Sequence, residues 1–96
     1  MATSTSTLET ANGSRYLQQL CKHWSHKFTV DFDSKQGTIE LPTGVCMLDA
    51  APSQLVIKVD AQEATNLGKL EEVVADHIKR FAFKEDLSFH WKRSAA

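Results

Sequence analysis

The sequence predicts an α+β fold, a two-layer sandwich with two helices packed on one face of a mostly antiparallel sheet. Three observations predict it. Two stretches carry apolar residues at helical spacing, four short segments between them alternate apolar and polar residues, and only a few residues connect these segments. Because short connections join antiparallel neighbours, we expect the element order (β)-α-β-β-β-β-α-β.

The length of the chain, 96 residues, is enough for one domain. We expect residues 11–93 to form this single α+β domain. Residues 1–10 are rich in Ser and Thr, and we expect them to be a flexible N-terminus that contains at most a short strand within "STLETA".

The first helix is predicted from Gly13 to about His26, with Asn12 in the N-cap position, where its side chain would accept a backbone hydrogen bond. Its apolar residues share one stripe and are Leu17, Leu20, Cys21 and Trp24. After this stripe the apolar period changes to two, which predicts that the helix ends and a strand begins.

Four strands are predicted after this helix, and a fifth near the end of the chain. The first four are expected at residues 28–32, 38–41, 45–50 and 55–61, and the last at residues 87–92 ("LSFHWK"). In each segment apolar side chains occupy alternate positions. This pattern is typical of a sheet that has one face on the core.

The second helix is predicted to run for about 20 residues after a D-x-x-E capping pattern formed by Asp60 and Glu63. Its inward stripe consists of Leu67, Leu70, Val74, His77, Ile78 and Phe81. Gly68 lies inside this helix at a cost of roughly 1 kcal/mol relative to Ala. We expect it to mark a close approach to the sheet.

Charge and hydropathy exclude several classes of protein. The 11 Lys and Arg residues against 12 Asp and Glu give a net charge of −1, so the chain lacks the basic excess that binds nucleic acid. The sequence has no run of about 18 apolar residues and no secretory signal at its start, which predicts a protein without a membrane span. We expect a cytoplasmic location, in which Cys21 and Cys46 stay reduced.

The sequence gives no sign of catalysis. It contains no Gly-rich phosphate loop, no G-x-S-x-G and no H-E-x-x-H motif. Cys21 and His23 are two apart on the predicted helix and therefore do not face each other as a nucleophile pair would. We expect a protein that is not an enzyme, and no cofactor is indicated.

The stretch "LCKHWSHKF" contains the candidate ligands Cys21, His23 and His26, and the second helix adds Asp76 and His77. If the two helices bring His77 beside His23, with Cys21 or Asp76 near them, the group would bind a metal or a small ligand. Zinc usually needs three or four donors. The alternative is structural, with His23 and His26 complementing the helix dipole and His77 satisfied by a hydrogen bond in the core.

Two further surfaces are candidates for binding. The cations Lys22, Lys27, Arg80 and Lys84 lie near the ends of the two helices and would form an anion-binding patch if those ends lie side by side; the alternative is ordinary dipole matching by solvated charges. On the sheet face away from the helices, the candidates for a protein contact or a homodimer are Val45, Met47, Val56 and His90.

Three stretches together resemble a known family: "RYLQQLCKHWSHKF", "DFDSKQGTIELPTG" and "LEEVVADHIKRFAFKEDLSFHW". They are similar to the bacterial domain of unknown function 2218, over residues 11–91. The resemblance implies a stand-alone domain of this size and, in some bacteria, a similar domain joined to siderophore-interacting flavoproteins that release iron from ferric chelates. This chain has no flavin-binding part, so the resemblance does not carry over a reductase activity.

Two function hypotheses follow. The first is a non-catalytic ligand- or metal-binding accessory module linked to iron or siderophore handling, with His23, His26 and His77 as donors. The second is a protein-interaction or dimerisation module that uses the open sheet face and has no small-molecule site. Shift changes at the histidines on adding metal would favour the first, and association weakened by Met47→Asp would favour the second.

Overall fold

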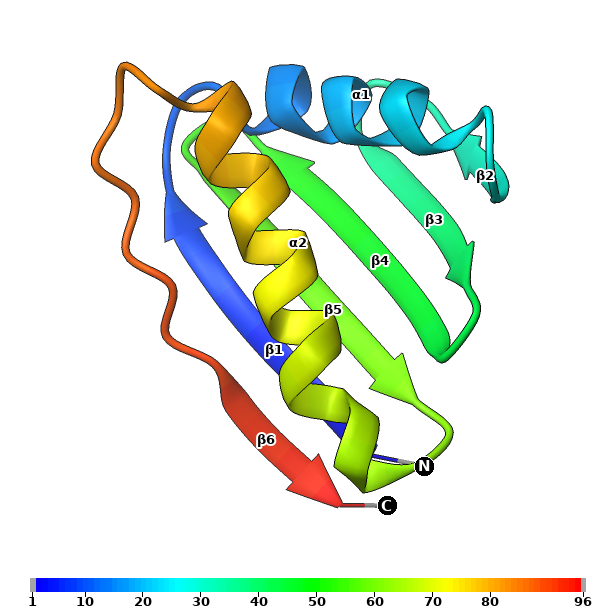
Figure 1. The fold of residues 1–96 in the computed structure, drawn as a ribbon. Helices are drawn as coiled ribbons and strands as arrows, with labels where there is room; N and C mark the ends of the chain where they lie inside the picture. The colour runs from blue at the N-terminus through cyan, green and yellow to red at the C-terminus, as the bar shows by residue number, and fades with distance from the viewer. Residues whose placement is uncertain (1, 96) are drawn as a thin grey trace.

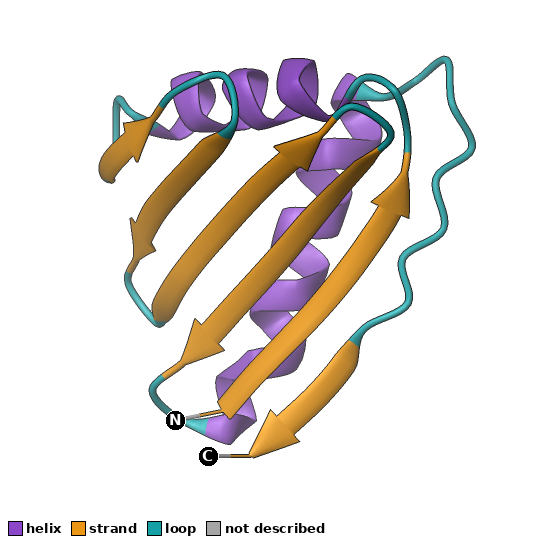
Figure 2. Cartoon of the chain, turned by 180° about the vertical axis from the view of Figure 1, so that it is seen from behind, coloured by secondary structure: helices purple, strands orange, loops and turns teal. Residues whose placement is uncertain are grey.

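The structure is a computed structural model and describes residues 2–95. In chain order the elements are β1 (Ala2–Glu9), α1 (Gly13–Trp24), β2 (Thr29–Phe32), β3 (Gln36–Leu41), β4 (Gly44–Ala51), β5 (Gln54–Ala61), a 3-10 turn (Ala64–Asn66), α2 (Leu67–Phe81) and β6 (Lys92–Ala95). Both helices lie on the same face of the sheet, as Figure 1 shows, and Figure 2 shows the opposite face without a described helix over it. The predicted α+β class and element order are confirmed.

The sheet has six antiparallel strands in the order β2-β3-β4-β5-β1-β6. The predicted meander is present as β2 to β5. Within the described chain, no helix is both long and apolar enough to cross a membrane.

The structure differs from the sequence analysis at β1. Residues 2–9 form an eight-residue strand that pairs with β5 along its whole length, from Ala2 opposite Ala61 to Glu9 opposite Gln54. The first four residues of β1 also pair with β6. Residues 2–9 of the segment expected to be flexible therefore form part of the sheet, and residues 2–5 have neighbouring strands on both sides.

The small side chains of this strand explain why its hydropathy pattern does not predict it. The residues of β1 that face the core are Ala2, Ser4, Ser6 and Leu8. Only Leu8 among them is large and apolar, so the alternation hardly appears in hydropathy. Ser4 is fully buried, and its hydroxyl donates a hydrogen bond of 2.6 Å to a carboxylate oxygen of Glu71 in α2.

The core lies between the two helices and the inner face of the sheet. α1 packs over β2, β3 and β4, while α2 runs along β5 and β1 (Figure 1). The fully buried residues include Leu17, Leu20, Ile39, Ile57, Val59, Val74 and Ile78. Burying each of these side chains stabilises the fold by roughly 1.5–3 kcal/mol. The stripes of both predicted helices are thus the surfaces that pack, except that His77 and Phe81 of the predicted second stripe are only half-buried.

The N-terminal end of α2 also differs from the prediction. Asp60 remains in β5, where its carboxylate accepts a hydrogen bond of 2.5 Å from the Thr3 hydroxyl, so it does not cap the helix. The α-helix begins at Leu67, after the 3-10 turn and without a side-chain cap. Gly68 approaches the guanidinium of Arg93 rather than the body of the sheet.

The last strand begins five residues later than predicted, at Lys92 instead of residue 87. β6 covers Lys92–Ala95, whereas Leu87, Phe89 and Trp91 lie half-buried in an extended segment outside the described strands. The register of β6 is fixed by Arg93, which donates two hydrogen bonds, of 3.0 and 2.8 Å, to the carboxylate of Glu71. The predicted alternation between apolar and polar residues is present, but the segment that carries it packs against the core without pairing with a strand of the sheet.

Candidate functional site

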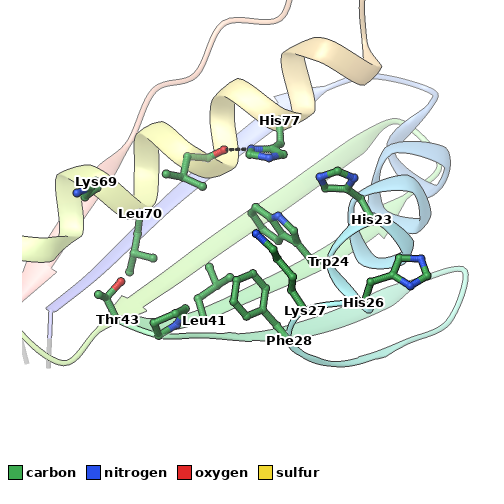
Figure 3. A pocket seen from close by; sticks show the side chains of 12 residues that line it. His23, Trp24, His26, Lys27, Phe28, Leu41, Thr43, Lys69, Leu70 and His77 are labelled. Atoms are coloured by element: carbon green, nitrogen blue, oxygen red, sulfur yellow. Dashed lines mark hydrogen bonds between the residues drawn. The ribbon is translucent and has the colours of Figure 1, made fainter.

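A cavity lies between the C-terminal end of α1, the middle of α2 and the turn that joins β3 to β4. Its volume is about 640 Å³. The lining residues are His23, Trp24, His26, Lys27, Phe28, Leu41, Pro42, Thr43, Lys69, Leu70, Val73 and His77 (Figure 3). We call this cavity the helix groove. Its size falls within the range typical of small-molecule sites.

The wall from α1 is built by a tight change of direction at the end of the helix. The backbone N–H groups of Lys27 and Phe28 both donate to the carbonyl oxygen of Trp24, at 3.0 and 2.9 Å. This turn places Lys27 and Phe28 beside the last residues of α1. In Figure 3 the side chains of Trp24 and Lys27 extend towards α2, whereas that of His26 points away from it.

The wall from α2 follows from helical spacing. Lys69, Val73 and His77 are four residues apart, so they project from one face of the helix, next to Leu70. This face is not the buried stripe of α2, because Val73 and Lys69 remain accessible. One helix therefore supplies both core packing and a wall of the groove.

The groove brings together two histidines that are 54 positions apart in the sequence. The ring centroids of His23 and His77 are 5.4 Å apart, and the His77 ring lies 4.9 Å from that of Trp24. His77 Nδ1 lies 2.8 Å from the carbonyl oxygen of Val73. Because a carbonyl can only accept, Nδ1 carries the proton, which leaves Nε2 available to a ligand.

The structure thus contains features of both interpretations of His77. The hydrogen bond to Val73 is the backbone contact that the structural alternative requires, and the proximity to His23 is the arrangement that the binding hypothesis requires. The sequence left these two interpretations open, and they turn out to be compatible.

The other predicted ligands do not join this pair. Cys21 is fully buried beneath α1 against Gly37, and burial raises the pKa of its thiol to about 11, so the thiol stays protonated. Asp76 is exposed and does not line the groove. Among residues 2–95 no group of three or more His, Cys, Asp and Glu side chains is placed to hold a metal ion.

The predicted anion patch is divided by the fold. Lys27 lines the groove, but Lys22, Arg80 and Lys84 do not, and the Lys84 ammonium instead lies 5.8 Å from the ring centroid of Phe83. Lys69 replaces them as the second lysine of the groove. The sequence analysis missed Lys69, although its spacing of four and eight residues from Val73 and His77 predicts that they share a face.

The groove has an uncompensated positive lining. Its charged and titratable side chains are those of Lys27, Lys69 and three histidines, and no Asp or Glu is among the described residues that line it. Within the described chain the one ion pair joins Arg93 to Glu71, and it includes neither lysine of the groove.

A second polar cluster, missed entirely by the sequence analysis, lies at the opposite end of the helix pair. The carboxylate of Glu85, just beyond α2, accepts hydrogen bonds from Thr10 (2.8 Å), from the Asn12 side chain (3.0 Å) and from the Tyr16 hydroxyl. These hydrogen bonds hold the pKa of Glu85 below its usual value, and burial together with Glu85 raises the pKa of Tyr16. Asn12 thus holds Glu85 and does not cap α1 with its side chain.

The open sheet face carries the predicted contact residues in part. Val45, Met47 and Val56 are half-buried on the strands β4 and β5, between charged neighbours such as Lys58. His90 is exposed and lies in the segment before β6, beside a hollow at the edge of β1, so it is not part of a strand on this face.

Comparison with known proteins supports the fold. A family model described as "Uncharacterized protein conserved in bacteria (DUF2218)" matches residues 5–92. The NMR structure of PA4090 from Pseudomonas aeruginosa is similar to this chain, with 36% sequence identity over 96% of both chains and a TM-score of 0.81. No curated protein matches the sequence.

Proposed function

The chain belongs to the DUF2218 family of uncharacterized bacterial proteins, and from its own geometry we propose that it is a non-catalytic module that binds a small ligand in the helix groove. The proposal includes a cytoplasmic location. The observation that carries it is the convergence of His23, His77 and Lys27 on one apolar cavity of about 640 Å³. A mostly apolar pocket with a few convergent polar groups is the usual form of a small-molecule site.

The metal-binding form of this proposal requires a ligand that brings its own donors. His23 and His77 provide two imidazoles, fewer than the three or four protein donors of most zinc sites. A metal would therefore bind here as part of a chelate, with the chelator filling the remaining coordination positions. The resemblance to domains joined to siderophore-interacting proteins makes a ferric chelate the first such ligand to test.

The test is an NMR screen of the full chain with small organic compounds, Zn²⁺ and a ferric chelate analogue containing Ga³⁺, which avoids paramagnetic broadening. We expect saturable shifts that include the Trp24 indole, the Val73 amide and the rings of His23 and His77. Saturating shifts confined to the sheet face, or no saturation with any compound, would contradict the proposal.

A matched pair of variants locates the site. Val73→Trp places a large ring at the wall of the groove, where Val73 is 36% exposed, and should abolish the shifts. Val45→Trp places the same ring on the sheet face and should leave them unchanged. Both variants add the same apolar side chain, so a general effect on solubility or stickiness would appear in both.

The second candidate function is a protein-interaction or dimerisation module that uses the sheet face. The absence of a described helix over this face, together with the half-buried Val45, Met47 and Val56, favours it. Sedimentation at increasing concentration tests the homodimer. Association that Met47→Asp weakens would support this candidate, and a monomer at every concentration would exclude self-association.

A further inference from the structure

We infer that the ligand of the helix groove is a small organic acid with a flat, apolar body, of the class of planar aromatic carboxylates. The inference rests on the proposed function and names the chemical class of its ligand. Its two parts, the negative charge and the flat apolar body, are carried by different residues of the groove.

The charge of the ligand follows from the lining. Lys27 and Lys69 lie on opposite walls, and no Asp or Glu among the described residues lines the cavity. The whole chain has a net charge of −1, so this positive lining is a local feature and not part of a generally basic surface. A ligand with one negative charge finds complementary charge on both walls.

The end of α1 opposes this effect, but only weakly. The C-terminal end of a helix carries about half a unit of negative charge on its free carbonyl groups. Here several of these carbonyls already accept hydrogen bonds. Ser25 donates from its backbone N–H to Cys21 and from its hydroxyl to Lys22. The backbone N–H groups of Lys27 and Phe28 donate to Trp24. The two full lysine charges therefore dominate the groove.

The shape of the ligand follows from the rings around the cavity. Trp24 lies between the rings of His77 and Phe28, with centroid distances of 4.9 and 6.2 Å, and Leu41 and Leu70 add apolar walls. Flat rings gain from offset or edge contacts with such aromatic side chains. The free Nε2 of His77 lies at the same wall and provides a hydrogen-bonding partner for a polar group on the ring.

The test compares three probes that share a naphthalene ring and differ in charge: 2-naphthoate, 2-naphthamide and 2-naphthylmethylammonium. Their dissociation constants are measured by NMR titration of the full chain at low salt. We expect 2-naphthoate to bind at least about tenfold more tightly than the neutral amide, and the cation to bind most weakly, as expected for charges near a protein surface. Added salt should reduce this preference.

Variants identify the lysines that select for charge. Lys27→Gln and Lys69→Gln should each weaken 2-naphthoate binding roughly three- to tenfold and change 2-naphthamide binding little. Lys22→Gln is the matched control, because Lys22 is an exposed lysine of α1 outside the lining. It should leave all three dissociation constants unchanged.

Each result distinguishes the ligand class from the proposed function. Equal binding of the acid and the amide, or tighter binding of the cation, would overturn the inference and leave a small-molecule site in place. Tighter binding of decanoate, a flexible aliphatic acid, than of 2-naphthoate would overturn the inference that the ligand has a flat body. If no probe binds and the wider screen is also negative, the proposed function itself fails.

Discussion

The two ends of the helix pair differ in whether their charged side chains have partners. Where the start of α1 meets the end of α2, the single carboxylate of Glu85 is surrounded by donors from Thr10, Asn12 and Tyr16. Where the end of α1 diverges from α2, Lys27 and Lys69 face a cavity without a described carboxylate in its lining. We call the first end the Glu85 cluster and compare it with the helix groove.

The difference shows which polar groups serve the fold. A buried hydroxyl without a partner costs roughly 1–3 kcal/mol, so the nearly buried Thr10 and Tyr16 need the acceptor that Glu85 provides. Exposed lysines lose little by remaining unpaired. The Glu85 cluster is therefore complete in the chain alone, whereas the lysines of the helix groove have no described carboxylate beside them in the lining, and the proposed ligand would supply the anion.

The strongest way to break this comparison is to displace β4 beside Thr43 and Leu70, two residues that line the groove. A Cβ added at Gly44 would lie 2.1 Å from the backbone oxygen of Asp60 and 2.9 Å from Leu70, so Gly44→Ala must separate β4 from β5. We expect a loss of about 3 kcal/mol in the free energy of unfolding, measured by urea titration, as for a severe case of overpacking. Gly68→Ala is the control and should keep or gain stability, by up to about 1 kcal/mol, since Ala is the better helix former and its Cβ would meet only the flexible end of Arg93. Equal losses would show that the close approach of β4 to β5 at Gly44 does not control stability.

Removing Glu85 tests whether the cluster is structural. Glu85→Ala leaves the hydroxyls of Thr10 and Tyr16 without their acceptor, and we expect a loss of roughly 2 kcal/mol in the free energy of unfolding. Glu72→Ala removes an exposed carboxylate from α2 and should change stability by less than about 0.5 kcal/mol. An equally small effect of Glu85→Ala would mean that water replaces the lost bonds.

Acid should weaken the carboxylate-centred contacts and not the groove. Hydrogen bonds from Tyr16 lower the pKa of Glu85, and those from Arg93 lower the pKa of Glu71, each from the ordinary value of 4.5. Since both folded-state pKa values lie below the unfolded ones, their stabilisation is fully present above about pH 4.5 and is lost as the pH falls through the folded-state values. Urea midpoints measured from pH 7 to pH 3 should therefore fall. Glu85→Gln should make this fall shallower, and an unchanged slope would contradict the assignment to Glu85.

The smallest effect is expected in the groove itself. Lys27→Gln and Lys69→Gln should change the free energy of unfolding by less than about 0.5 kcal/mol, because neither lysine has a described ion-pair partner. Their effect should appear in anion binding alone. A loss of 1 kcal/mol or more in either variant would mean that the lysine serves the fold, and the contrast between the two ends would disappear.

The sequence predicts the parts of the fold that carry a clear apolar period. The stripes of α1 and α2 and the alternation of β2 to β5 follow directly from it. β1 was missed as a full strand because Ser4 and Ser6 occupy core positions, and the partner of the buried Ser4 hydroxyl, Glu71, comes much later in the sequence. β6 was misplaced because Leu87, Phe89 and Trp91 predict an extended segment. The alternation of apolar and polar residues does not show which extended residues pair with a neighbouring strand.

The candidate site was predictable residue by residue but not as an arrangement. Helical spacing identifies the faces that carry His23 and His77, and it would also have identified Lys69. Their convergence depends on the angle between α1 and α2 and on the turn at Trp24, which are set by packing across the whole core. The same packing separates Cys21 and Asp76 from the histidines.

The pairing of β1 with β5 also has a consequence for how the chain folds. Its partners are between 45 and 59 residues apart in the sequence, whereas β2 to β5 join through short hairpins. Forming contacts between distant residues costs loop-closure entropy and slows folding, so we expect the hairpins to form before β1 docks. Until then β5 presents an open, eight-residue edge with an apolar face, which the β1 strand of another copy can occupy as well as its own. A dimer with exchanged β1 strands is therefore the misassembled product to expect when the chain refolds at high concentration.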